Sequence, residues 1–94
     1  MLEIHSEGGF SYWLPEDAKG EKVYIRVCIG SKFKEKKSSM VRLTSSRELL
    51  FSNEKKFSVN AREEKEIRDT IMKKFDMIIA DWESVNGKAE LLDC

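Results

Sequence analysis

An apolar stripe in the last third of the chain constrains the fold more than any other feature. Between Ile67 and Val85 apolar side chains recur every three or four residues, which is the period of one face of an α-helix. Asn60, with Glu63 three positions later, can form a capping box, and Asn86-Gly87 can end the helix. The pattern predicts one helix from about Asn60 to Asn86, about 39 Å long at 1.5 Å per residue. Its apolar face consists of Ile67, Ile71, Phe75, Ile78, Ile79, Trp82 and Val85, with Met72 beside it.

The first half of the chain predicts β-strands. Residues 2–5 alternate apolar and polar side chains, residues 10–14 are rich in aromatics, and a Gly-Gly pair between them suits a tight hairpin. Residues 22–29 form the clearest strand, because β-branched side chains occupy alternate positions. Residues 40–44 also have strand character, whereas residues 48–51 fit a short strand or a helical turn. The expected fold is α+β: a small antiparallel sheet of three to five strands, covered on one face by one long C-terminal helix.

Size and hydropathy predict the domain organisation. Ninety-four residues can bury one core and are too few for two, so we expect one domain in residues 1–87 and a flexible tail in residues 88–94. Apolar runs are no longer than four residues, as at 77–80, which excludes a membrane-spanning helix. The first residues lack the basic region and apolar stretch of a signal peptide. We therefore expect a cytoplasmic protein with no membrane partner.

The net charge of zero conceals an uneven distribution along the chain. Residues 1–21 carry a net charge of −4 and residues 48–94 a net charge of −3, whereas residues 31–47 carry +5. This basic segment can be a footprint for phosphate groups. It can also be a solvated hairpin or edge strand, since lysine protects exposed sheet edges from aggregation. Its basic side chains are Lys32, Lys34, Lys36, Lys37, Arg42 and Arg47.

Few residues suggest catalysis or metal binding. His5 could act as a general base, but no motif marks a serine or cysteine nucleophile, and an ordinary half-exposed histidine is the alternative. Cys28 and Cys94 have no CxxC spacing, and with one histidine they do not supply the ligands of a zinc site. A disulfide between them is disfavoured in a reducing cytosol. We therefore expect no catalytic residues, no cofactor, no metal and no enzymatic activity.

The expected sheet has one uncovered face, which suggests two functions. If the Val23 side of its strand packs on the helix, Tyr24 and Arg26 point to the uncovered face. The first hypothesis is a protein-interaction or self-association module, with a protein partner or a second copy bound to this face or to an overhang of the helix. The alternative is a weak nucleic-acid-binding accessory protein, because exposed aromatics beside a basic loop are typical of single-strand binding surfaces. The first is preferred because zero net charge and a pI near 6.6 provide no long-range attraction to phosphates. The residues of the alternative are Lys32, Lys34, Lys36, Lys37, Arg42, Tyr24 and Phe33.

Two stretches of the chain also match a known pattern. In residues 4–14 a histidine strand, a glycine turn and an aromatic strand follow one another, and the helix that begins after Phe57-Ser58 carries Trp82 near its end. Together these stretches resemble a small bacterial domain family of unknown function that is often proposed to occur in toxin–antitoxin-like gene pairs. The family's proline-rich start with paired histidines is absent, and residues 20–56 look like an insertion. The resemblance implies a histidine and aromatic hairpin followed by a helix, and it implies no settled activity.

Overall fold

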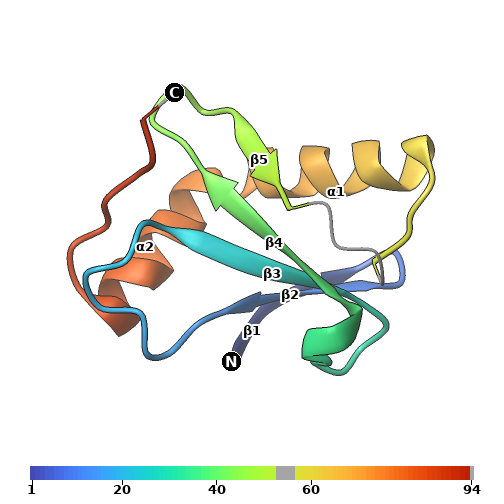
Figure 1. The fold of residues 1–94 in the computed structure, drawn as a ribbon, viewed down its shortest axis with the longest axis horizontal. Coiled ribbons are helices and arrows are strands. Elements are labelled where there is room, and N and C mark those ends of the chain that lie inside the picture. The colour runs from blue at the N-terminus through green and yellow to red at the C-terminus, as the bar shows by residue number, and fades with distance from the viewer. Residues whose placement is uncertain (53–56, 94) are drawn as a thin grey trace.

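The computed structural model describes residues 1–52 and 57–93 of the chain. Within them, five β-strands pair in the order of the sequence, each antiparallel to the next (Figure 1). Two helices follow the sheet and lie on one of its faces, so the fold is α+β as expected. The strands are β1 (Leu2–Glu7), β2 (Phe10–Leu14), β3 (Tyr24–Ile29), β4 (Ser38–Leu43) and β5 (Leu49–Phe51). The helices are α1 (Ala61–Lys73) and α2 (Phe75–Asn86), and a short 3-10 helix, η1 (Glu35–Lys37), precedes β4.

Local sequence accounts for the turns and for most strand boundaries. Gly8 and Gly9 adopt φ angles of +60° and +85°, which a tight turn between antiparallel strands requires and glycine adopts without strain. The strand β2 has the expected bounds, whereas β4 begins at Ser38, two residues earlier than expected. Residues 49–51 pair with β4 and are therefore a short strand and not a helical turn.

The core lies between the sheet and the two helices. Alternate residues of the central strands face the helices, and among them Ile25 and Val27 of β3 are completely buried. The helix side chains expected in the core are buried as predicted: Ile71, Phe75, Ile78 and Trp82. Val85, the last residue of the stripe, is exposed, so the apolar contact with the sheet ends one turn earlier than the pattern indicates.

The ends of the helical region follow the sequence signals. The Asn60 side chain accepts a hydrogen bond from the Glu63 N–H at 2.8 Å, and the Glu63 carboxylate accepts one from the Asn60 N–H at 3.1 Å. This confirms the capping box. Gly87, with φ of +86°, follows the last residue of α2. Within the described residues, neither helix has the length and apolar character that crossing a membrane requires.

The single helix predicted from Asn60 to Asn86 is wrong, because the chain forms two helices that meet at Lys74. The φ and ψ angles of Lys74, −106° and 14°, depart from helical values, and its N–H is shared between the carbonyls of Thr70 and Ile71. A straight helix of about 39 Å would exceed the longest dimension of the molecule, which is 33 Å. The break keeps both apolar faces against the sheet, so the projecting helix considered as a docking element does not form.

Residues 88–93 run across one end of the sheet (Figure 1). They form isolated parallel bridges with the residues that precede β3 and follow β4, and the side chains of Ala89 and Leu91 pack half-buried against the core. Residue 94 lies outside the described residues, and the mobility of the segment stays a prediction. The backbone bonds of the segment run from the Val23 N–H to the Glu90 carbonyl and from the Ser45 N–H to the Leu92 carbonyl, both at 2.9 Å.

Asn86 joins the end of α2 to the loop between β2 and β3. Its Oδ1 accepts a hydrogen bond from the Ala18 N–H at 3.0 Å, and its Nδ2 donates one to the Pro15 carbonyl at 2.8 Å. Only 5% of the residue is exposed, so both bonds are shielded from water. The sequence predicts a helix stop at Asn86-Gly87 and does not predict this second role of the asparagine.

Candidate functional site

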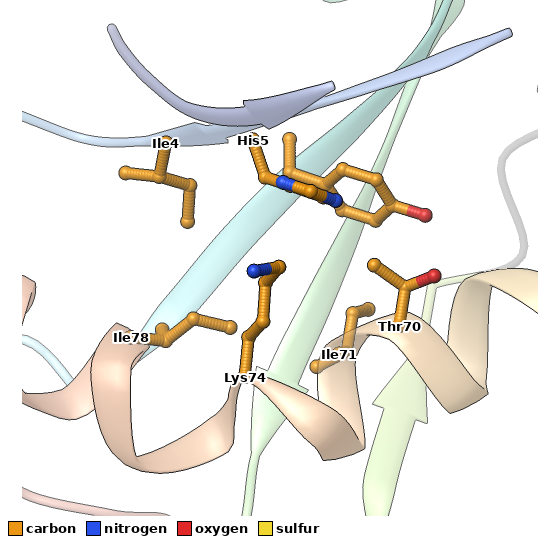
Figure 2. Close-up of a pocket in the computed structure, with 7 residues that line it drawn as sticks. Ile4, His5, Thr70, Ile71, Lys74 and Ile78 are labelled. Carbon is orange, nitrogen blue, oxygen red and sulfur yellow. The ribbon is translucent and has the colours of Figure 1, made fainter. Parts of the chain in front are cut away.

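His5 lies in a small pocket between the first hairpin and the junction of the two helices (Figure 2). A β-bulge between Glu3 and His5 shifts the pairing of β1 with β2. Because of this extra residue, Ile4 and His5 both line the pocket, whereas regular alternation would place consecutive residues on opposite faces. The other lining residues are Tyr12, Thr70, Ile71, Lys74 and Ile78.

The polar groups of this pocket contact one another. The rings of His5 and Tyr12 lie 5.7 Å apart at an angle of 37°, and Lys74 directs its amino group towards His5 (Figure 2). The Nε2 of His5 is buried; it lies 3.4 Å from a Glu7 carboxylate oxygen without hydrogen-bond geometry, and it has no other partner among the described residues. Burial raises the pKa of the Tyr12 phenol, a hydrogen bond with Thr70 partly opposes this rise, and the charge of Glu7 adds to it.

The pocket is too small for an organic substrate. The space in which the centre of a water molecule can lie is about 10 Å³, so the pocket holds about one water molecule. A wider groove of about 210 Å³ continues outside it along α1 and carries the carboxylates of Glu7, Glu66 and Asp69. In residues 1–52 and 57–93, no three histidine, cysteine or acidic side chains are arranged to hold a metal ion. His5 therefore has the position of a packed histidine between two layers.

The opposite side of the sheet carries three cross-strand rows of side chains. The first row, Ser11, Cys28 and Ser38, is buried although neither α1 nor α2 covers it. The side chains of the other two rows are half-buried or exposed, and we call these two rows the uncovered face. They consist of Glu3, Trp13, Arg26 and Met40 in the second row and of Tyr24, Arg42 and Leu50 in the third.

Residues 31–37, which we call the basic loop, fold back onto this side of the sheet. The ring of Phe33 meets the ring of Trp13 at 5.6 Å and 62°, an edge-to-face arrangement. The Ser38 hydroxyl donates a hydrogen bond to the Glu35 carbonyl at 2.8 Å and accepts one from Nη1 of Arg26 at 3.0 Å. The loop is thus packed against the sheet and does not project as a free hairpin tip.

Cys28 is buried beneath the basic loop. Its thiol lies 3.9 Å from the Lys34 carbonyl, and burial raises the pKa of the thiol. A protonated, buried thiol is unreactive at neutral pH, so Cys28 contributes packing. Cys94, with which a disulfide was not expected, lies outside the described residues.

The aromatic side chains of the uncovered face differ in availability. Trp13 is half-exposed, and its indole N–H donates to the Ser11 hydroxyl at 2.8 Å, which fixes the orientation of the ring. The ring of Tyr24 packs against Trp82 at 5.8 Å, and the Arg42 guanidinium lies 5.8 Å from its centre. Burial also raises the pKa of the Tyr24 phenol. Trp13 and Phe33 are therefore the rings that a ligand can reach, whereas the ring of Tyr24 packs against the core.

The uncovered face and the basic loop together form a positively charged surface. The four lysine side chains of the loop are exposed, and no carboxylate of the described residues forms an ion pair with them. In the part of the chain that the structure describes, the acidic residues of this surface are Glu3 and Glu35. Its basic residues are Arg26, Lys32, Lys34, Lys36, Lys37 and Arg42. The zero net charge of the chain therefore hides a face whose described residues carry a net charge of +4.

The structure brings most of the residues named for nucleic-acid binding to one side of the sheet. Lys32, Phe33, Lys34, Lys36 and Lys37 lie in the basic loop, and Arg42 lies in the third row. Tyr24 pairs with Arg42 in that row, but its ring packs against Trp82, so the prediction that Tyr24 contributes a free ring is wrong. The pattern omitted Trp13, which is the ring that anchors the loop. The sequence could have identified Trp13, because alternation along residues 10–14 places it on the face opposite Tyr12.

Comparisons with known proteins give no relative: no family model matches the chain, and searches of curated proteins and of solved structures find no similar protein. The resemblance to a toxin–antitoxin-associated family is therefore untested. Any function has to be inferred from the residues of this chain.

Proposed function

We propose that this protein is a non-enzymatic binding module of the cytoplasm that holds a polyanionic macromolecule on its uncovered face. The main support is the basic loop, because the contact between Phe33 and Trp13 holds four lysines beside two arginines of the sheet. Charges on a packed loop lose less conformational entropy on binding than charges on a free one. A preformed basic surface of this kind attracts an extended anion at close range even when the whole chain is neutral.

A protein partner or a second copy on the same face is the competing proposal. The centre of such an interface is usually apolar and depleted in charge. On the described part of the uncovered face, Leu50 is the large apolar side chain that is substantially exposed, at 41%, and two arginines lie in the same rows. This composition favours a polyanion over a second copy.

Retention on immobilised heparin, a polyanion without bases, tests the proposal. We expect Lys34→Glu/Lys36→Glu/Lys37→Glu to elute at clearly lower salt than the parent. The matched control is Lys65→Glu/Lys73→Glu/Lys88→Glu, which changes the net charge equally on exposed residues elsewhere. We expect the control to elute near the parent. Equal elution of the two triple variants, with circular dichroism showing that both are folded, would contradict the proposal.

Light scattering after size-exclusion chromatography tests the competing proposal. We expect a monomer at high micromolar concentration. A concentration-dependent dimer that Leu50→Glu abolishes would support self-association instead, because Leu50 is exposed on the uncovered face and makes no core contact.

A further inference from the structure

We propose that the polyanion is single-stranded nucleic acid, whose bases stack on Trp13 and Phe33 while the basic loop and Arg42 contact its phosphates. This inference rests on the proposed function and adds the chemical class of the ligand. It depends on the position of two accessible rings, Trp13 and Phe33, beside the lysine ammonium groups of the basic loop, which form no ion pair with the described residues. Binding of a polyanion alone would need the ammonium groups but not the rings.

The two rings are suited to stacking because they are held in place before any ligand arrives. The hydrogen bond to Ser11 fixes the indole of Trp13, and the edge-to-face contact fixes Phe33 against it. A nucleobase has a flat π-face that can lie on a half-exposed aromatic ring. RNA-binding sheets of similar size stack two or three bases on their strand aromatics. An acidic peptide has no such group to match the rings, so the rings favour nucleic acid over an acidic protein.

The position of the charges suits a strand that crosses the sheet. The lysines lie at one end of the uncovered face, in the loop between β3 and β4, and Arg42 lies further along β4 in the third row. A strand laid over Trp13 can therefore meet cations on both sides of the stacked bases. In a duplex the bases are already stacked on one another, so a duplex can use only the charges.

Fluorescence anisotropy with a labelled oligothymidylate of about twelve nucleotides tests the inference, since single-strand sites cover about 4–16 nucleotides. The reference ligands are an abasic phosphodiester of the same length and a duplex of the same length. We expect the oligonucleotide to bind at least about tenfold more tightly than the abasic chain, because each stacked base contributes about that factor. If the lysines make four phosphate contacts, log affinity should fall against log salt with a slope of about −2.8.

Substitution of Trp13 separates stacking from charge. We expect Trp13→Leu to weaken oligonucleotide binding about tenfold more than it weakens abasic-chain binding, because loss of the contact with Phe33 affects both ligands whereas loss of stacking affects only the oligonucleotide. Trp13→Tyr should restore most of the lost affinity, because it replaces an aromatic ring at the same position. Circular dichroism verifies that both variants are folded. If the leucine variant is not, the comparison of the oligonucleotide with the abasic chain on the parent protein still tests stacking.

Each remaining outcome has one meaning. Equal affinity for the oligonucleotide and the abasic chain, with heparin retention still dependent on the basic loop, would refute the nucleic-acid inference and leave the proposed function intact. Equal affinity for the oligonucleotide and the abasic chain, together with heparin retention that does not depend on the basic loop, would refute both the nucleic-acid inference and the proposed function. A duplex that binds more tightly than the single strand would also refute the stacking geometry, because its bases cannot reach Trp13.

Discussion

Replacement of Asn86 should destabilise the protein more than any other single polar substitution on α2. Its amide joins the helix end to the Ala18 N–H and the Pro15 carbonyl, at 3.0 and 2.8 Å. Asn86→Ala removes both hydrogen bonds and leaves two buried backbone groups without a partner. Each such group costs about 1–3 kcal/mol, so we expect a loss of about 2–4 kcal/mol. A chain of this length has a stability of about 5–14 kcal/mol, so the loss is measurable by urea unfolding at constant m-value.

Two further variants refine this measurement. Ser84→Ala, at an exposed position of the same helix, should change stability by less than about 0.5 kcal/mol. Asn86→Asp keeps the acceptor for Ala18 but places a carboxylate oxygen against the Pro15 carbonyl, which raises the pKa of the new side chain above its unfolded value. Its penalty relative to the parent should therefore be largest at neutral pH and shrink as pH falls and the protonated acid donates to that carbonyl. An Asn86→Ala protein within about 0.5 kcal/mol of the parent would show that the two bonds carry no net stability.

Three other predictions concern the core, the C-terminal segment and alkaline pH. Phe75→Ala should cost about 3–5 kcal/mol, and Phe75→Leu clearly less, because Phe75 is buried and Arg47 stacks on its ring at 4.6 Å; urea unfolding measures both. Removal of residues 88–94 should lower the melting temperature, because it deletes two backbone bonds and the packing of Ala89 and Leu91; an unchanged melting temperature would support a flexible tail. Stability should fall as pH rises above about 10, because Tyr12 and Tyr24 have raised pKa values and ionise first in the unfolded chain. Tyr12→Phe should reduce that fall, which unfolding curves across the alkaline range would detect.

The sequence predicts the strands and the helix start because their determinants are local. Period-two patterning, the Gly8-Gly9 turn and the Asn60 capping box each act within a few residues. The break at Lys74 has no local signal, since the apolar stripe continues through it, and it lets both helices fit a molecule whose longest dimension is 33 Å. The bulge that turns His5 towards the helices has no signal either, because its flanking residues alternate regularly.

In the candidate site too, neighbouring residues predict some features, whereas others depend on contacts between distant parts of the chain. Alternation correctly places Arg26 on the face away from the helices, but it is wrong for the ring of Tyr24, which packs against Trp82 of α2 and the core. The docking of the basic loop on Trp13 depends on one aromatic residue, Phe33, within a polar stretch. A single apolar residue has no periodicity, so the pattern treats it as part of a solvated loop. The contact of Tyr24 with Trp82 joins residues 58 positions apart and could not be predicted from either segment.

The pairing of each strand with its neighbour in the sequence also determines the order in which the protein can assemble on the ribosome. A sheet without crossovers can form hairpin by hairpin as the chain emerges, since each new strand pairs with the strand made just before it. The helices that cover it are encoded last, so the apolar side of the sheet, with Ile25 and Val27, stays exposed until α2 is synthesised. A nascent chain that stalls before α1 presents a paired but uncovered apolar surface, which is the kind of species that chaperones bind and that aggregates when they do not.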